Sequence, residues 1–241
     1  MKQIIYDNYS ELSLNTAEQI AAIISEKPDA LLCFPAGETP LGTFNHLIKL
    51  NKTGKISFKD CKIVGLDEWA NLGSLQNENC FSFLRKHLFD HIDLSYENLC
   101  FFDGESTDLI HGCVKTDEFL KKNGPIDMIL LGIGMNGHLG LNEPGTPFDL
   151  CSHIVKLDEI TKIVGQKYFS DKVQLTYGIT LGLKYIMEAN TVILQMNGFK
   201  KADVARQLIN CEVSTDFPAS VLKSHLNVFL LLDKEAAKYV E

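Results

Sequence analysis

The sequence predicts an α/β fold in which a mainly parallel sheet lies between layers of helices, the doubly wound or Rossmann-like arrangement. Short apolar runs alternate with amphipathic stretches along almost the whole chain of 241 residues. This alternation is too regular for an all-α or an all-β protein. A chain of this length is expected to form a single domain of this class, with room for a small lid.

Five apolar runs are interpreted as buried strands. Each is short, rich in aliphatic residues and bounded by turn residues, as buried parallel strands usually are. The runs are residues 30–34, 62–66, 128–133, 191–196 and 228–232.

Amphipathic stretches between these runs predict the helices. Residues 16–26 place Ile20, Ile23 and Ile24 on one face, which is the helical period. Residues 145–180 mix Pro, Gly and charged residues without a clear period, and this predicts a lid over a site. The other predicted helices are residues 41–50, 78–88, 107–122 and 200–209. Gly124-Pro125 ends the third of these.

Composition argues against two classes of partner. The net charge of −8 is a poor match to nucleic acid, which requires a basic surface. No apolar run approaches the roughly 20 residues that cross a membrane, and the first residues lack the apolar run of a signal peptide. The seven cysteines are scattered without a CxxC pair, so they are interpreted as reduced thiols of a cytoplasmic protein. The oligomeric state stays open, a homo-oligomer included.

Three segments follow predicted strands, where an open parallel sheet binds its ligands. The first is residues 34–41, in which Ala36, Gly37 and Thr39 form a small-residue turn before a helix. Free backbone N–H groups and the helix dipole at such a turn suit a phosphate. The alternative is a purely structural turn with Thr39 as the N-cap and Pro40 at the first helical position.

The second segment contains two adjacent carboxylates, Asp67 and Glu68, directly after the strand predicted at 62–66. Side chains at adjacent strand positions point in opposite directions, so only one is expected to face a cleft and act there as a base. The alternative is a solvated loop or a helix cap.

The third segment is the glycine-rich stretch 131–145, which contains His138 and Glu143. Glycines let the backbone approach a ligand, and a carboxylate near a histidine can orient and charge it for acid–base chemistry. The stretch lacks a GxGxxG that leads into a helix and lacks an HExxH or cysteine cluster, so neither a dinucleotide nor a metal site is expected. A structural histidine is the alternative.

Together, in this order and spacing, the three segments resemble the glucosamine-6-phosphate deaminase/isomerase family over nearly the whole chain. In the most specific stretch, 134–144, the general deaminase pattern is close to G-x-D-G-H-I-A-F-N-E-P, and this chain reads GMNGHLGLNEP. Three segments are most similar in sequence to the galactosamine-6-phosphate isomerase branch. They are this stretch, Leu-Asp-Glu-Trp and residues 180–184.

The resemblance implies a reaction on a hexosamine 6-phosphate, in which the ring opens, a proton moves between C1 and C2, and ammonia leaves. No metal or organic cofactor is implied. The galactosamine branch implies conversion of galactosamine 6-phosphate to tagatose 6-phosphate. The alternative is glucosamine 6-phosphate deamination to fructose 6-phosphate.

The same resemblance implies roles for acid–base residues. Asp67 resembles the carboxylate that carries the proton between C2 and C1, and His138 resembles the group that assists ring opening. Glu143 resembles the acid that orients His138. One departure is Asn136, where the family has an aspartate, because an amide cannot stabilise a positive imidazolium as a carboxylate does.

The phosphate cradle implied by the family corresponds to Ala36–Thr39. Lys201 resembles a lysine that reaches the phosphate from a later helix start, and Lys167 is aligned with an arginine that often contacts it. The second departure is Glu38, because a carboxylate beside a phosphate is unfavourable unless it points away.

Two other functions stay open on the same fold. Related lactonases share G-x-D-G-H but continue toward Leu-Phe-Pro-Gly, whereas this chain continues LNEPG, which favours the deaminase. A sugar-phosphate-sensing domain of a transcription regulator normally carries a DNA-binding helix-turn-helix, for which 241 residues leave little room. Asn136 keeps that alternative open as a degraded site.

Overall fold

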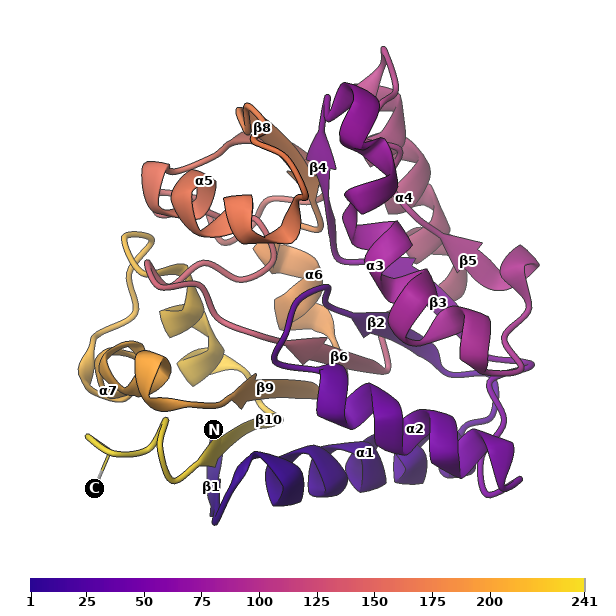
Figure 1. The fold of residues 1–241 in the computed structure, drawn as a ribbon, viewed down its shortest axis with the longest axis vertical. Helices are drawn as coiled ribbons and strands as arrows, with labels where there is room; N and C mark the ends of the chain where they lie inside the picture. The colour runs from indigo at the N-terminus through magenta and orange to yellow at the C-terminus, as the bar shows by residue number, and fades with distance from the viewer. Residues whose placement is uncertain (241) are drawn as a thin grey trace.

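A seven-stranded sheet runs through the centre of the molecule in the order β1-β10-β9-β6-β2-β3-β5, and every pairing in it is parallel (Figure 1). The computed structural model describes residues 1–240. The predicted α/β class with a parallel sheet is therefore confirmed. The strands are β1 (Lys2–Tyr6), β2 (Leu31–Phe34), β3 (Lys62–Gly65), β5 (Leu99–Cys100), β6 (Met128–Leu131), β9 (Val192–Met196) and β10 (Val228–Asp233).

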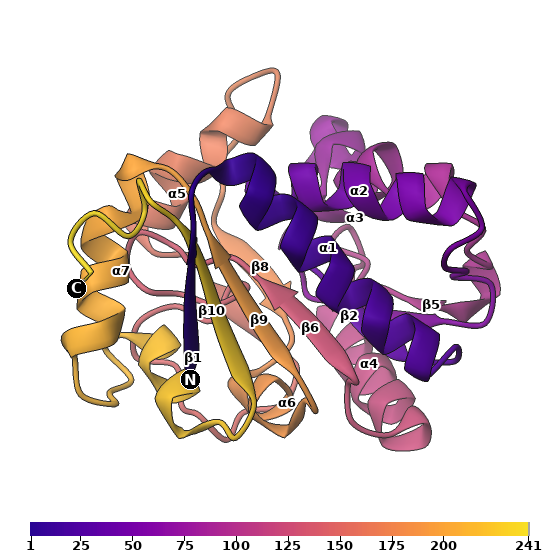
Figure 2. The ribbon, with the colours of Figure 1, turned by 90° about the horizontal axis from the view of Figure 1, so that it is seen from below.

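Helices cover both faces of this sheet. One face packs against α1 (Tyr9–Glu26), α2 (Leu41–Lys52) and α3 (Cys80–His87) (Figure 2). The other face packs against α4 (Leu109–Asn123), α6 (Leu183–Glu188) and α7 (Ala202–Asn210). Each face of the sheet thus has its own hydrophobic core. The four buried residues of β2 point alternately into these two cores.

A second, antiparallel sheet of order β4-β8-β7 lies beside the carboxyl ends of the main strands. Its strands are β4 (Asp67–Ala70), β7 (His153–Lys156) and β8 (Tyr177–Thr180), and α5 (Glu159–Gly165) lies between β7 and β8 in the chain. Trp69, Leu141 and Leu157 belong to a small hydrophobic core of this part. The irregular region expected at 145–180 thus contains two strands and a helix, each too short to give a period in the sequence.

Short 3-10 helices fill several connections. They are η1 (Gly73–Glu78), η2 (Phe89–His91), η3 (Tyr96–Asn98), η4 (Gln166–Tyr168), η5 (Phe199–Lys201) and η6 (Pro218–Ser224). All seven cysteines are free thiols. Among the described residues, no helix has the length and apolar character needed to cross a membrane.

Four predicted helix starts differ from the observed ones, and those of α4 and α7 each lie two residues later than predicted. The helix predicted from residue 16 begins at Tyr9, because the Asn8 side chain accepts a hydrogen bond from the N–H of Glu11 and caps it. The helix predicted from residue 78 begins at Cys80, after the cap residue Asn79. Strand β1 was not expected at all; its partner β10 is more than 220 positions later in the chain.

The order of the strands reverses between β2 and β6. These strands are neighbours, yet the chain continues from β2 toward β3 and from β6 toward β9, on opposite sides. Such a reversal leaves a crevice at the carboxyl ends of the two strands. The segments 34–41 and 131–145 follow β2 and β6, so both border this crevice.

The opposite, amino-terminal ends of these strands are joined by the buried carboxylate of Asp127. It accepts hydrogen bonds from the backbone N–H of Leu31 at 2.8 Å, from Nδ2 of Asn190 at 3.0 Å and from Nζ of Lys27 at 2.8 Å. One side chain therefore ties the start of β2 to the start of β6 and to the segment before β9.

Replacing this carboxylate should destabilise the fold. Asp127→Ala leaves the buried N–H of Leu31 and the amide of Asn190 without an acceptor, so the free energy of unfolding should fall by about 2–3 kcal/mol. Urea denaturation followed by circular dichroism measures the change. The matched control is Asp60→Ala at an exposed position, expected to stay within about 0.5 kcal/mol of wild type. Equal stabilities of the two variants would contradict the assignment.

Candidate active site

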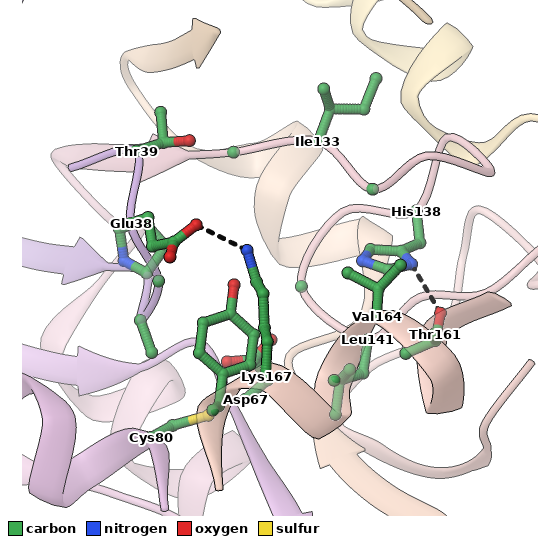
Figure 3. A pocket seen from close by; sticks show the side chains of 18 of the residues that line it. Glu38, Thr39, Asp67, Cys80, Ile133, His138, Leu141, Thr161, Val164 and Lys167 are labelled. Atoms are coloured by element: carbon green, nitrogen blue, oxygen red, sulfur yellow. Dashed lines mark hydrogen bonds and ion pairs between the residues drawn. The ribbon is translucent and has the colours of Figure 1, made fainter. Parts of the chain in front are cut away.

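A cavity of about 730 Å³ opens at the carboxyl ends of β2, β3 and β6, between the main sheet and the second sheet (Figure 3). All three segments singled out in the sequence contribute to its walls. Of the nine predicted site residues, seven line it, and the other two, Asn136 and Glu143, lie behind His138. The seven are Ala36, Gly37, Thr39, Asp67, His138, Lys167 and Lys201.

One end of the cavity is the turn after β2. Gly37 has a φ of +117°, which favours glycine, and a Cβ there would lie 3.3 Å from the hydroxyl of Tyr168. Within the part of the chain that the structure describes, the N–H groups of Gly37, Glu38 and Thr39 have no protein acceptor. Consecutive free N–H groups before a helix form a cradle that suits an anion such as phosphate.

The hydroxyl of Tyr9, at the start of α1, holds this turn in place. It donates to the carbonyl of Thr39 at 2.9 Å and accepts from the N–H of Gly42 at 2.8 Å. Helix α2 begins at Leu41 after Pro40, and no side chain of its own caps it. The predicted Thr39 cap is therefore wrong, because the acceptor at this helix start comes from Tyr9 in a different helix.

Two lysines face the same end of the cavity. Lys201, from η5, donates to the carbonyl of Ile133 at 2.5 Å. Burial, together with the charge of Lys167, lowers the pKa of Lys201 to about 8. Lys167, from η4, pairs with Glu38 at 2.7 Å. The Glu38 carboxylate thus points toward Lys167 (Figure 3). An acid is tolerated in this turn because the lysine balances its charge.

The adjacent carboxylates of β4 point in opposite directions, as strand geometry requires. Asp67 lines the cavity. Glu68 is buried on the other side and accepts from the N–H groups of Trp69, Cys80 and Phe81 at 2.8, 2.9 and 3.0 Å. Glu68 therefore caps α3, and Asp67 is the one carboxylate of the pair that faces the cavity, where its role as a base stays a prediction.

Burial raises the pKa of Asp67 to about 6, although His138 and a hydrogen bond from the Cys80 thiol act in the opposite direction. Burial likewise raises the pKa of Glu68 to about 7 against its three backbone donors. A carboxylate with a pKa near 6 is ionised at neutral pH and is a stronger base than an exposed aspartate. Asp67 is therefore suited to accept a proton from a bound molecule.

The imidazole of His138 lies against Gly134, where a Cβ would come within 2.4 Å of the ring. This contact explains one glycine of the loop, because any side chain there would displace the ring. The Nδ1 atom lies 3.4 Å from Oε2 of Glu143 and 3.1 Å from Oγ1 of Thr161. The predicted pairing of His138 with Glu143 is present in the structure.

Among the described residues, no hydrogen bond joins Asn136 to the imidazole. Its Nδ2 donates to Oε2 of Glu143 at 2.9 Å, and its Oδ1 accepts from the backbone N–H of His138 at 3.3 Å. Burial raises the pKa of Glu143, but the neighbouring His138 and Thr161 side chains and the hydrogen bond from Asn136 outweigh it, so the net pKa is lowered. The amide thus supports an ionised Glu143, and a carboxylate in its place would face another carboxylate.

The predicted set omits residues that support the site, among them Tyr9, Cys80, Thr161 and Tyr168. Each is an ordinary residue of a helix or helix start, with no motif around it. Each reaches the cavity, or a residue that lines it, through tertiary packing. Within residues 1–240, no three His, Cys, Asp or Glu side chains gather as ligands for a metal ion.

Comparison with known proteins identifies the family. Residues 7–230 match the family described as glucosamine-6-phosphate isomerases/6-phosphogluconolactonase. A glucosamine-6-phosphate deaminase of Bacillus pumilus is 42% identical over 238 residues, which cover 98% of each chain. A glucosamine-6-phosphate deaminase of Clostridium tetani is 39% identical over the full length of both chains. Although some segments resemble the galactosamine branch, these relatives over the whole chain are named glucosamine-6-phosphate deaminases.

Solved structures agree with this result. A monomeric glucosamine-6-phosphate deaminase superposes with a TM-score of 0.94 at 38% identity, over 99% of this chain and 100% of the other. The 6-phosphogluconolactonase of Trypanosoma brucei shares the fold, with a TM-score of 0.77 at 19% identity, over 100% of this chain and 98% of the other. The chain therefore belongs to the family of glucosamine-6-phosphate isomerases and 6-phosphogluconolactonases.

Proposed function

We propose that the protein is an isomerising deaminase that converts glucosamine 6-phosphate and water into fructose 6-phosphate and ammonia. The observation that carries the proposal is one cavity whose walls combine an anion cradle, a carboxylate of raised pKa and a histidine. A sugar phosphate has the matching chemistry, an anionic group at C6 and a weakly acidic C–H at C2.

The choice between the two hexosamines rests on the relatives. Glucosamine and galactosamine 6-phosphates differ in the configuration at C4, and the segments that resemble the galactosamine branch favour the second sugar. Full-length relatives at 39–42% identity are named glucosamine-6-phosphate deaminases. Similarity over the whole chain weighs more than short segments, so glucosamine 6-phosphate is the proposed substrate and galactosamine 6-phosphate the second candidate.

In the proposed mechanism the phosphate binds first at the turn after β2. The free N–H groups of Gly37 and Thr39 donate to its oxygens, and Lys201 moves from the carbonyl of Ile133 to the phosphate. A dianionic phosphate also competes with Glu38 for Lys167. This end of the site fixes C6 and leaves C1 and C2 near Asp67.

Ring opening then exposes the aldehyde. His138 moves a proton between the C1 hydroxyl and the ring oxygen, so that the C1–O5 bond breaks and an open-chain amino aldehyde forms. Glu143, held ionised by its neighbours, stabilises the positive imidazolium during this step. The histidine acts as base and acid in turn and ends in its starting state.

Asp67 completes the isomerisation. It takes the C2 proton, which the adjacent aldehyde acidifies, while the ammonium group on C2 gives one proton to O1, so that a neutral enolamine forms. It returns the C2 proton to C1, which gives a protonated C2 imine. Water adds to the imine, and ammonia leaves from C2 as the ketose forms. In this scheme the carboxylate is regenerated, and each proton that leaves one atom arrives at another.

The direct test is the release of ammonia by the purified protein from each hexosamine 6-phosphate. The proposal predicts the higher kcat/KM for glucosamine 6-phosphate and little turnover of unphosphorylated glucosamine. A preference for galactosamine 6-phosphate would restore the second candidate. Hydrolysis of 6-phosphogluconolactone without ammonia release from either amino sugar would contradict the proposal.

Removing the proton acceptor should abolish turnover while the fold is kept. Asp67→Asn retains the shape of the side chain but cannot take the C2 proton, so kcat should fall on the order of 10²–10⁴-fold. For the wild type, kcat/KM should fall as the pH drops through about 6, because Asp67 is then protonated. Stopped ammonia assays from about one pH unit below to about two units above the pKa of Asp67 measure both effects.

The control is Asp60→Asn, an exposed aspartate outside the cavity, which should retain wild-type turnover. A folded Asp67→Asn variant with wild-type kcat would remove Asp67 from the mechanism.

Lys201 should act mainly in binding. Lys201→Ala removes a charge-assisted contact far from the reacting carbons, so KM should rise roughly 10–100-fold with a smaller change in kcat. The matched control is Lys223→Ala, because Lys223 also donates to a backbone carbonyl, that of Ile209 at 2.9 Å, but lies outside the cavity. An equal rise of KM in both variants would mean that Lys201 only supports the fold.

A further inference from the structure

Thr161 brings the lid region into contact with the acid–base pair. His138 and Glu143 both belong to the loop after β6, whereas Thr161 lies on α5, between β7 and β8. The Thr161 side chain is buried, with 4% of the residue exposed, and its Oγ1 lies 3.1 Å from Nδ1 of His138 (Figure 3). A residue more than 20 positions away in the chain thus contacts the proposed acid–base histidine directly.

Two oxygen atoms face the Nδ1 position of His138: Oγ1 of Thr161 at 3.1 Å and Oε2 of Glu143 at 3.4 Å. The shorter contact lies within normal hydrogen-bond range, and the longer one lies outside it. Glu143 also accepts from Asn136 and from the N–H of Asp158, so its carboxylate is surrounded by donors. Thr161 therefore makes the better hydrogen bond to the imidazole.

The proton positions follow from the chemistry of these groups. The hydroxyl of Thr161 has one proton, and it helps to lower the pKa of the neighbouring Glu143, whose carboxylate can only accept. If that proton goes to Glu143, the oxygen lone pairs of Thr161 face Nδ1 and accept its proton. In this arrangement Nδ1–H of His138 donates to Oγ1 of Thr161, and the Thr161 hydroxyl donates to Glu143. This fixes the neutral tautomer with the proton on Nδ1. The other nitrogen, Nε2, is left unprotonated on the side of the cavity (Figure 3).

We propose that Thr161 is a positioning residue that sets the Nδ1–H tautomer and the orientation of His138, so that α5 completes the acid–base apparatus. The proposal rests on the function proposed above for this cavity. An unprotonated Nε2 is the form that can take the proton from the C1 hydroxyl at the start of ring opening. The opposite tautomer would present a donor to that hydroxyl and could not accept.

The ring is confined on two sides. Gly134 lies against it from the loop after β6, and Thr161 fixes its Nδ1 from α5. Without the hydroxyl, only the 3.4 Å contact with Glu143 remains at Nδ1. The ring could then rotate or exchange tautomers, and a smaller fraction of the enzyme would be competent for ring opening. The position of α5 and the competence of His138 are therefore linked.

The test compares variants with and without the hydroxyl. Thr161→Val keeps the branched shape and removes the oxygen, whereas Thr161→Ser keeps the oxygen. Thr161→Val should lower kcat for the preferred hexosamine 6-phosphate about tenfold, the loss expected for one hydrogen bond to a group that becomes charged. KM should change by less than about twofold, since no contact with the phosphate is lost. Thr161→Ser should stay near wild type.

A matched control is Thr116→Val. Thr116 is also a buried threonine on a helix, with 1% of the residue exposed, but it lies on α4 and outside the cavity. Its replacement should leave kcat unchanged. If Thr161→Val does not fold, as judged by circular dichroism, Thr161→Ala takes its place in the comparison with Thr161→Ser.

The tautomer itself is read by ¹⁵N–¹H NMR of the histidine rings in the absence of substrate, with His138→Gln to assign the signals. The wild type should show the Nδ1–H form of His138, and Thr161→Val should show a mixture or the Nε2–H form. An unchanged tautomer in folded Thr161→Val, or an equal loss of kcat in Thr161→Ser, would overturn the proposal. Because the spectra require no substrate, this readout stays valid even if neither hexosamine 6-phosphate releases ammonia, the result that would refute the proposed function alone.

Discussion

The site depends on one constraint of the main sheet, the reversal of strand order between β2 and β6. The two strands are neighbours and parallel, but the chain leaves them toward opposite edges of the sheet. Their following loops must therefore separate, and the cavity occupies the space between them. The turn after β2 supplies free N–H groups, and the loop after β6 supplies His138 and Glu143. The proposed phosphate cradle and the proposed acid–base pair thus come from the two strands at which the order reverses.

The third contribution comes from β4, where burial and hydrogen bonding assign different roles to two adjacent carboxylates. Glu68 satisfies the first N–H groups of α3 and cannot turn away without leaving them unpaired. Because neighbouring side chains on a strand alternate, Asp67 is directed into the cavity. The helix cap therefore orients the proposed base. The same β4 pairs with β8, so the second sheet, on which Thr161 depends, is anchored at this point.

The sequence alone predicts much of this arrangement, because strands of high hydrophobicity and the segments directly after them are visible in it. Asp67, His138 and the small-residue turn around Gly37 were identified on that basis. Strands β1 and β5 and the strands of the second sheet were not, because none of them is a buried apolar run of four or more residues and each depends on a distant partner. Tyr9 and Thr161 were missed for the same reason. Their hydroxyl groups act on residues more than 20 positions away, which no local pattern encodes.

The central claim is that one cavity binds the phosphate at the turn after β2 and presents C2 of the sugar to Asp67. A crystal structure of Asp67→Asn with glucosamine 6-phosphate tests it most directly, because the variant should bind the sugar without converting it. The account predicts phosphate oxygens on the N–H groups of Gly37 and Thr39 and on Nζ of Lys201. It also predicts C2 within about 3.5 Å of the side chain at position 67, the approach needed for proton transfer. A phosphate bound elsewhere, or C2 facing away from that side chain, would contradict it.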